Sequence, residues 1–307
     1  MEYITDPASH TFPRGTVVTL GKFDGVHKGH RKLLQRVLDI SREGQLDAAV
    51  FTFDVPPQVR IGHKPARMLM TNAERRQILS DCGISLLVEY PFTEQVRNMT
   101  AEEFCRKVLR EQMHAEVIIA GSDFHFGRNR QGNADYLQAH QQDFGFRVEI
   151  LDKEMDGDRE ISSTYIREEL TLGHMEKVKE LMQLPYSISG PVVHGENLGH
   201  KLGFATINQI PEESKLLPPN GVYFSLTRIH GQEIPSITNI GNKPTVQGKQ
   251  LGVETHLLGF CGDLYGKDAC VSLLHYQRPE QRFLSVEALS QQIRDDICRA
   301  ESFHGMA

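Results

Sequence analysis

The first half of the chain alternates short, continuous apolar runs with stretches whose apolar residues recur at helical spacing. A continuous apolar run is typical of a strand that is buried on both faces of a sheet. The alternation of such strands with helices predicts a doubly wound α/β domain built on a parallel sheet. The strands expected from these runs are 17–20, 48–53, 85–89, 116–120 and 147–151.

Helical spacing and capping patterns predict the helices between these strands. Residues 30–41 place Leu33, Leu34, Val37 and Leu38 on one face, as in an amphipathic helix. Two capping boxes mark further helix starts, because a threonine is followed three residues later by a glutamate. These boxes are Thr71 with Glu74 and Thr100 with Glu103.

After residue 185 the pattern changes to β-type runs interrupted by Gly and Pro, with no helix until the end. Residues 222–227 alternate apolar and polar, as in a strand with one buried face. His230-Gly231 predicts a turn into a strand that ends before Asn239. These features predict a small antiparallel β-barrel with one C-terminal helix, and therefore domains at 1–184 and 185–307. The other expected elements are strands 253–258 and 269–276 and helix 285–300.

Composition and charge narrow the class of protein. With 39% hydrophobic and 24% charged residues, the 307-residue chain is globular rather than disordered or fibrous. A net charge of −6 disfavours a dedicated nucleic-acid binder, and the lack of any apolar stretch of about 20 residues disfavours a membrane protein. Five cysteines without a CxxC pair disfavour a zinc knuckle and fit a reducing compartment. We therefore expect a soluble, cytoplasmic protein.

The segment GKFDGVHKGH, from Gly21 to His30, falls between the first expected strand and the first expected helix. Ligands of open α/β sheets bind at the carboxyl ends of the strands. Glycines let the backbone approach a phosphate, and a helix start offers free N–H groups. His27 and His30 can then stabilise charge on the α-phosphate and the departing pyrophosphate. The alternatives are a tight turn with two surface histidines and a metal site, for which only Asp24 lies nearby as a further ligand.

The segment ISSTYIR at 161–167 opens a later helix. Hydroxyl side chains at a helix start are commonly N-caps. Followed by Arg167, however, they would also make a phosphate cradle, because a guanidinium is a fixed, positively charged fork. HxGH early in a chain and SSTxxR late are together the paired marks of the nucleotidyltransferase superfamily, which includes adenylyltransferases.

Over nearly its whole length the chain resembles the bacterial bifunctional riboflavin kinase/FAD synthetase family. The matching N-terminal pieces are GKFDGVHKGH, FTFD at 51–54, TAEEF at 100–104, GSDFHFG at 121–127 and SSTYIR. The resemblance implies catalytic roles for His27, His30 and Arg167 at ATP. It also implies flavin or nucleotide contacts for Asp123 and Phe126, whereas the residues alone favour a strand end with buried rings. The phosphate contacts that it implies are Gly21, Phe23, Gly29, Ser162, Ser163 and Thr164.

The second half contains no Walker P-loop, but it resembles the kinase half of the same family. The family's core GRxLGFPTAN is here GHKLGFATIN, at 199–208. The resemblance implies that Thr206 and Asn208 hold magnesium and phosphate and that Asn239 contacts the flavin. Glu254 matches the catalytic glutamate, whose carboxylate can take the proton of the ribityl 5′-hydroxyl as that oxygen attacks the γ-phosphate. The glycines expected in a flap over the phosphates are Gly195 and Gly199.

Several positions depart from the family pattern. His200 replaces an arginine and exchanges a permanent charge for a mostly neutral group. Ala205 replaces a proline, and Ile207 replaces an alanine, which we expect to place a larger side chain beside the magnesium-contacting residues. Val55-Pro56-Pro57 replaces Pro-His-Pro and removes a histidine from the first domain. We therefore expect a kinase that is present but weakened.

The leading interpretation is a bifunctional transferase of flavin-cofactor biosynthesis. It would use ATP and Mg²⁺ to convert riboflavin to FMN and FMN to FAD, with small molecules as its partners and an oligomeric state that the sequence leaves open. The alternatives are an FAD synthetase whose barrel only holds flavin, an adenylyltransferase for another acceptor such as a pantetheine or nicotinate phosphate, and a non-catalytic flavin-binding regulator. The residues that argue against the regulator are His27, His30, Arg167 and Glu254.

Overall fold

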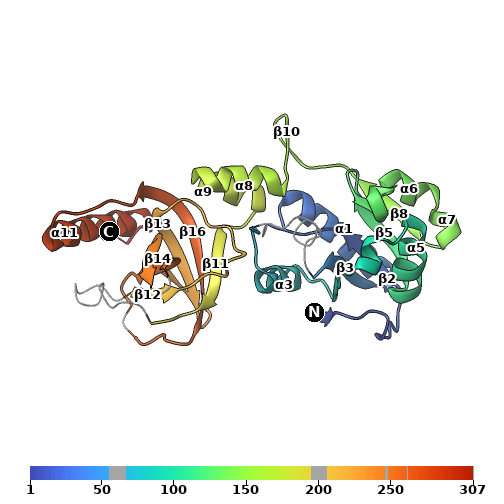
Figure 1. Ribbon diagram of the computed structural model, residues 1–307, viewed down its shortest axis with the longest axis horizontal. Coiled ribbons are helices and arrows are strands. Elements are labelled where there is room, and N and C mark those ends of the chain that lie inside the picture. Colours follow the sequence, from blue (N-terminus) through green and yellow to red (C-terminus); the bar gives the residue numbers. More distant parts are fainter. Residues whose placement is uncertain (55–66, 195–205, 246–247, 261, 307) are drawn as a thin grey trace. The chain divides into compact units, whose positions relative to one another are not determined.

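The computed structural model describes residues 1–54, 67–194, 206–245, 248–260 and 262–306 (Figure 1). These residues form two compact units, Met1–Ser163 and Thr164–Ala307. Helices α8 (Ser163–Leu172) and α9 (Met175–Met182) therefore belong almost wholly to the second compact unit. The predicted domain boundary near residue 185, which assigns one expected reaction to each side, stays a proposal.

The first unit is built on a six-stranded parallel sheet, in the order β1-β4-β3-β2-β5-β8. The predicted doubly wound fold is confirmed, and each predicted strand is present. The sequence missed β1, which is only three residues long and has two exposed side chains. The strands are β1 (Glu2–Ile4), β2 (Thr16–Leu20), β3 (Asp47–Phe53), β4 (Leu86–Tyr90), β5 (Ala115–Gly121) and β8 (Arg147–Leu151).

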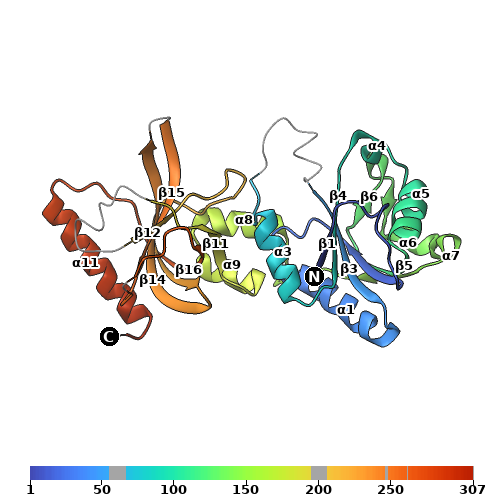
Figure 2. The same ribbon diagram turned by 90° about the horizontal axis from the view of Figure 1, so that it is seen from below.

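Helices cover both faces of this sheet, with α1 and α3 on one side and α5, α6 and α7 on the other (Figure 2). Both predicted capping boxes are formed, at Thr71 with Glu74 and at Thr100 with Glu103. The helices are α1 (Lys28–Gly44), α3 (Asn72–Asp81), α4 (Glu94–Arg97), α5 (Ala101–Glu103), the π-helix η1 (Phe104–Gln112), the 3₁₀-helix η2 (Arg128–Arg130), α6 (Ala134–Ala139) and α7 (Gln141–Phe144). Two short hairpins complete the unit, β6 (His125–Phe126) with β7 (Gly132–Asn133) and β9 (Met155–Asp156) with β10 (Arg159–Glu160).

The second unit contains a six-stranded antiparallel sheet, in the order β11-β16-β13-β14-β15-β12. A helix that begins at its N-cap Ser285 ends the chain, as predicted. The elements are β11 (Tyr186–Pro191), β12 (Thr206–Gln209), β13 (Gly221–Ile229), β14 (Gln232–Thr245), β15 (Gly248–Leu257), β16 (Asp268–Pro279) and α11 (Val286–Phe303).

The strand β14 runs further than the sequence indicated. We expected it to end before Asn239, and this prediction was wrong, because β14 continues to Thr245. Gly241 and Pro244 disfavour a strand interior when considered alone. Here the register with β15 continues through both of them, so cross-strand pairing outweighs the local preference.

The two edges of the antiparallel sheet meet near its start and make it a half-barrel. The Val193 N–H donates to the Asn208 carbonyl of the opposite edge strand at 2.8 Å. The Gln209 amide donates at 2.9 Å to the carbonyls of Gly190 and Ala269. Fully buried hydroxyls inside the half-barrel bond to one another; they are Ser225, Thr227, Ser236, Thr238 and Thr255. One face of the sheet therefore lines the interior of the half-barrel.

Candidate active sites

The first candidate site is the loop between β2 and α1, at the carboxyl end of the parallel sheet. Its first residue, Gly21, donates its N–H to the Phe51 carbonyl at 3.1 Å, so the start of the loop is bonded to the neighbouring strand β3. The backbone has positive φ at Phe23 (50°), Gly25 (94°) and Val26 (35°). Non-glycine residues rarely adopt such angles, and a β-branched residue does so least readily. The loop is therefore held in a conformation that its sequence does not favour by itself.

The two motif histidines lie against each other in this loop. Their ring centroids are 3.8 Å apart and the rings are nearly parallel, while Phe23 packs against His30 at 4.8 Å. A Cβ on Gly29 would come within 3.3 Å of the His27 ring, and one on Gly21 within 3.1 Å of the Phe23 ring. His27 is only 8% exposed. The alternative of a turn with two surface histidines therefore does not describe this loop.

Burial also sets the charge of this histidine pair. It lowers the pKa of His27 to about 4, against a smaller opposing effect of the Asp123 carboxylate. Burial likewise lowers the pKa of His30 well below its ordinary value, and the nearby His27 lowers it further. Among the described residues, neither Nδ1 atom has a hydrogen-bond partner. At neutral pH the pair consists of uncharged imidazoles, each able to donate one hydrogen bond.

A hydrogen bond joins this loop to the second motif. The Ser163 hydroxyl, at the start of α8, donates to the Asp24 carbonyl at 2.7 Å across 139 positions of sequence. The Asp24 carboxylate is buried and accepts the Met70 N–H at 3.1 Å. The sequence indicated Asp24 only as a candidate metal ligand. Its position in the middle of the motif, between glycine and aromatic neighbours, was the available signal for its role in the loop structure.

The remaining residues of the second motif follow Ser163 or precede it directly. Ser162 is half-buried, Thr164 is exposed and Arg167 is half-buried, one turn into α8. The helix start is thus attached to the first motif through Ser163. The predicted phosphate contacts of Ser162, Thr164 and Arg167 remain predictions.

The predicted flavin contacts of the first unit lie beyond the end of β5. The Asp123 carboxylate is exposed and pairs with Lys153 at 3.1 Å. Lys153 also pairs with Glu160 at 2.6 Å, two residues before Ser162. Phe126 is only 9% exposed and its ring packs on those of Phe104, Phe124 and Tyr136. A ring packed in this way has little surface for a flavin, while Asp123 remains accessible.

The second candidate site is a row of polar side chains across three neighbouring strands. Glu254 of β15 lies opposite Asn239 of β14 on one side and opposite Asn208 of β12 on the other. Residues directly opposite each other in a ladder point to the same face of the sheet. The Thr206 hydroxyl donates to the Glu254 carboxylate at 2.8 Å. Strand register therefore brings Asn239 and Glu254 together with the predicted magnesium pair, Thr206 and Asn208.

The structure corrects one expectation about this row. We expected Ile207 to crowd Thr206 and Asn208. Instead Ile207 is 7% exposed and packs in an apolar cluster with Val192 and Leu257, because successive residues of a strand point to opposite faces. Its larger side chain therefore fills the half-barrel interior rather than the candidate site.

Other predicted positions cannot be placed. Gly195, Gly199, His200, Ala205 and the Val55-Pro56-Pro57 segment lie outside the described residues. The flap over the phosphates and the effect of the missing first-domain histidine therefore remain predictions.

The second candidate site offers oxygen ligands for a metal ion. No group of three or more His, Cys, Asp and Glu side chains within the described ranges is placed to hold a metal by itself. Thr206, Asn208 and Glu254 nevertheless supply hydroxyl, amide and carboxylate oxygens. Mg²⁺ prefers oxygen ligands and is usually bound by few protein groups together with substrate phosphates and waters. The residues of this site therefore fit magnesium that arrives with a nucleotide.

The fold and its two sites define a two-domain, ATP-using transferase. Residues 9–165 match the FAD synthetase family model and residues 182–304 match the riboflavin kinase family model. The chain belongs to the bifunctional riboflavin kinase/FMN adenylyltransferase family.

Relatives cover almost the whole chain. The bifunctional riboflavin kinase/FMN adenylyltransferase of Escherichia coli K12 is 34% identical over 294 residues, which are 95% of this chain and 94% of that protein. The protein of the same name from Pseudomonas fluorescens is 34% identical over 291 residues, 94% and 93% of the two chains. A crystal structure titled macrolide-efflux protein from Streptococcus pneumoniae has a TM-score of 0.85 and 30% identity over 96% of each chain. In the described part of this chain, no helix has the length and apolar character needed to cross a membrane.

Proposed function

We propose that the two candidate sites carry out the two reactions of the family, one in each half of the chain. The chain is a transferase with riboflavin kinase and FMN adenylyltransferase activities. Riboflavin and ATP give FMN and ADP at the half-barrel site, and FMN and ATP give FAD and pyrophosphate at the α/β site. The observation that carries this proposal is the row Asn239–Glu254–Asn208. It brings together the residues assigned to the kinase reaction, whose rate was in doubt because of the departures from the family pattern.

In the kinase step, Glu254 acts as the general base. Its carboxylate accepts the proton of the ribityl 5′-hydroxyl while that oxygen attacks the γ-phosphorus and ADP leaves. The Thr206 hydroxyl, already bonded to this carboxylate, fixes its orientation. Asn239, on the neighbouring strand, lies where it can contact the flavin. Bound with ATP at Thr206 and Asn208, magnesium would neutralise phosphate charge.

In the adenylyl-transfer step, a phosphate oxygen of FMN attacks the α-phosphorus of ATP and pyrophosphate leaves. The contribution of the protein is positioning and charge stabilisation, because no covalent intermediate is needed. His27 and His30 donate hydrogen bonds to the α-phosphate and the leaving group. Arg167 supplies a permanent positive charge, which the neutral histidine pair lacks. The backbone N–H groups at Phe23 and Gly29 and the hydroxyls of Ser162 and Thr164 hold the remaining phosphate oxygens. The Gly21 N–H and the Ser163 hydroxyl instead hold the loop itself, because they donate to the Phe51 and Asp24 carbonyls.

A product assay tests both reactions at once. The purified chain is incubated with Mg²⁺, ATP and either riboflavin or FMN, and the flavins are separated by chromatography. We expect FMN and FAD from riboflavin, and FAD with pyrophosphate from FMN. FAD from FMN without any product from riboflavin would disprove the kinase assignment. No product from either flavin would disprove both.

A further inference from the structure

The loop between β2 and α1, residues 21–27, needs support from other segments to keep its conformation. Phe23 and Val26 are non-glycine residues at positive φ, a strained arrangement that persists only where surrounding structure fixes it. The rings of His27 and His30 have no hydrogen bond at Nδ1 within the described residues and pack on each other and on Phe23, which belongs to the same loop. The residues that hold the loop backbone therefore also set the direction in which both imidazoles point.

Much of that support comes from the beginning of α3. The Met70 N–H donates to the Asp24 carboxylate at 3.1 Å, and the Arg75 guanidinium donates to the Lys22 carbonyl at 3.4 Å. The capping box fixes this helix start through the reciprocal bonds of Thr71 and Glu74, at 2.9 and 3.2 Å. The segment that touches the loop is thus itself rigid.

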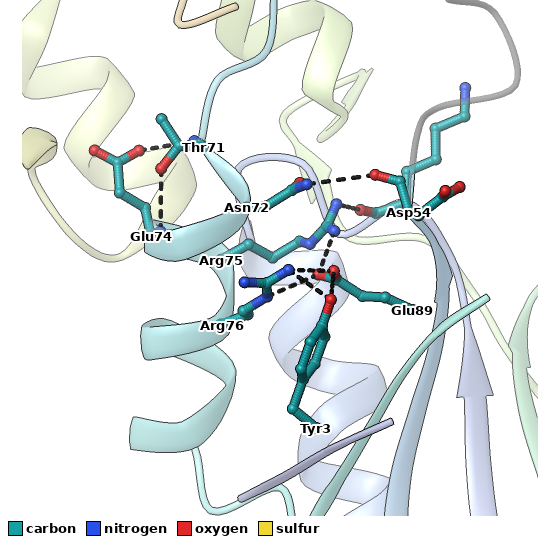
Figure 3. A network of polar contacts seen from close by, with 9 residues as sticks. Tyr3, Asp54, Thr71, Asn72, Glu74, Arg75, Arg76 and Glu89 are labelled. Carbon is teal, nitrogen blue, oxygen red and sulfur yellow. Dashed lines mark hydrogen bonds and ion pairs between the residues drawn. The ribbon is translucent and has the colours of Figure 1, made fainter. Parts of the chain in front are cut away.

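Arg75 is in turn fixed by a buried carboxylate at the carboxyl end of the neighbouring strand β4. Glu89 is 1% exposed and accepts hydrogen bonds from Arg75 at 2.8 Å, Arg76 at 2.7 Å and the Tyr3 hydroxyl at 2.7 Å (Figure 3). Burial would raise the pKa of Glu89, but the hydrogen bonds from both guanidiniums and from Tyr3 outweigh it and lower the pKa. Glu89 is therefore a carboxylate that keeps Arg75 in one orientation.

We propose that Arg75 and Glu89 are positioning residues for adenylyl transfer. Arg75 uses one Nη to bind Glu89 and the other to bind the Lys22 carbonyl, five positions before His27. The fork geometry of the guanidinium makes both contacts possible at once. Both side chains are almost fully buried, so they would act through the loop backbone rather than directly on the substrate. The inference rests on the proposed function of this loop.

Arg76 offers a matched comparison within the same network. It binds the same Glu89 carboxylate and lies over the Tyr3 ring at 4.1 Å, and within the described residues its side-chain contacts are with Glu89 and Tyr3 rather than with the loop. Replacing Arg76 therefore removes one partner of the buried carboxylate, as replacing Arg75 does. Only the Arg75 variants also prevent one side chain from binding Glu89 and the Lys22 carbonyl at the same time.

The test compares Arg75→Gln, Arg75→Lys and Arg76→Gln in the full chain. FAD formation from FMN is measured as kcat and KM for ATP, with FMN formation from riboflavin in the same preparation as the reference. We expect Arg75→Gln to lower kcat for FAD formation by about 10- to 100-fold, since small displacements of reacting groups have effects of this size. Arg75→Lys, which can bind Glu89 or Lys22 but not both, should give a smaller loss. Arg76→Gln should stay within about twofold of the wild type.

A second measurement does not depend on activity. The imidazole resonances of His27 and His30 in NMR spectra should shift in both Arg75 variants and stay in place in Arg76→Gln. Equal losses of FAD formation in Arg75→Gln and Arg76→Gln, or unshifted imidazole resonances in the Arg75 variants, would overturn the positioning role. If instead the wild-type chain forms no FAD, the proposed function fails, and the resonances still decide whether Arg75 orients the loop.

Discussion

The two candidate sites of this chain are built in opposite ways. The α/β site lies on a loop with left-handed backbone at Phe23 and Val26, whereas the half-barrel site lies on extended strands. The position of Glu254 follows from its ladder partners alone, since pairing fixes both neighbours and face. The position of His27 depends on contacts made by distant segments. A strand site is thus robust to changes elsewhere, while a loop site is only as precise as the residues that support it.

Glu254→Gln should produce the largest difference between the rates of the two reactions. Loss of the general base should lower FMN formation by about 10²- to 10⁴-fold. The amide oxygen can still accept the hydrogen bond of Thr206, so the strand arrangement and FAD formation from FMN should be unchanged. The two rates are measured on one preparation. Glu233→Gln, at an exposed position of β14, is the control, and a kinase rate that survives Glu254→Gln would refute the base assignment.

His27→Gln should give the reverse result. Removing one donor to developing charge typically costs about 10²- to 10³-fold in kcat, so FAD formation should fall by this factor while FMN formation is retained. Together with Glu254→Gln it forms a crossed pair, in which each variant is the control for the other. If either variant lowers both rates alike, the two sites are not independent and the comparison between them fails.

The strands, both capping boxes and the C-terminal helix could be predicted because their signals are local. Long apolar runs and a threonine followed by a glutamate report on burial and capping directly. β1 could not be predicted in this way, since its three residues acquire strand geometry only by pairing with β4. The end of β14 was misjudged for the same reason, because its continuation through Gly241 depends on β15.

The candidate sites were predictable to different degrees. The family resemblance supplied the half-barrel residues, but only the register shows that Asn208, Glu254 and Asn239 form one row. Arg75 and Glu89 could not be found from sequence, because they belong to no motif and meet only through the packing of α3 against β4. Residues that support a loop site from other elements are not marked by a motif in the sequence.

The loop site should also respond to pH through its buried histidine pair. His27 has a pKa of about 4 in the folded protein and an ordinary value of 6.5, so between these values the unfolded chain binds more protons. Stability therefore falls as the pH is lowered through this window and is fully present above it. By pH 5 the loss from His27 should be about 2 kcal/mol. Urea unfolding at pH 7 and pH 5 measures it.

The comparison with His27→Gln isolates this contribution from the other titrating groups. Besides burial, Asp123 acts on the pKa of His27, and His27 acts on the pKa of His30. Because the Gln variant lacks the titrating group at position 27, it should lose about 2 kcal/mol less stability than the wild type between the two pH values. An identical pH dependence in both proteins would show that His27 is not buried as an uncharged group.

The smallest expected effect tests the strand site at two adjacent residues. Ile207→Val removes one methylene from the half-barrel interior and should lower the free energy of unfolding by about 1 kcal/mol, without changing FMN formation. Thr206→Val, one position earlier on the other face, keeps the shape of the side chain but removes the hydroxyl that binds Glu254. It should lower FMN formation while changing stability less. If Ile207→Val raised the kinase rate, the larger side chain would be crowding the site after all, and strand alternation alone would not explain how the half-barrel keeps its chemistry on one face.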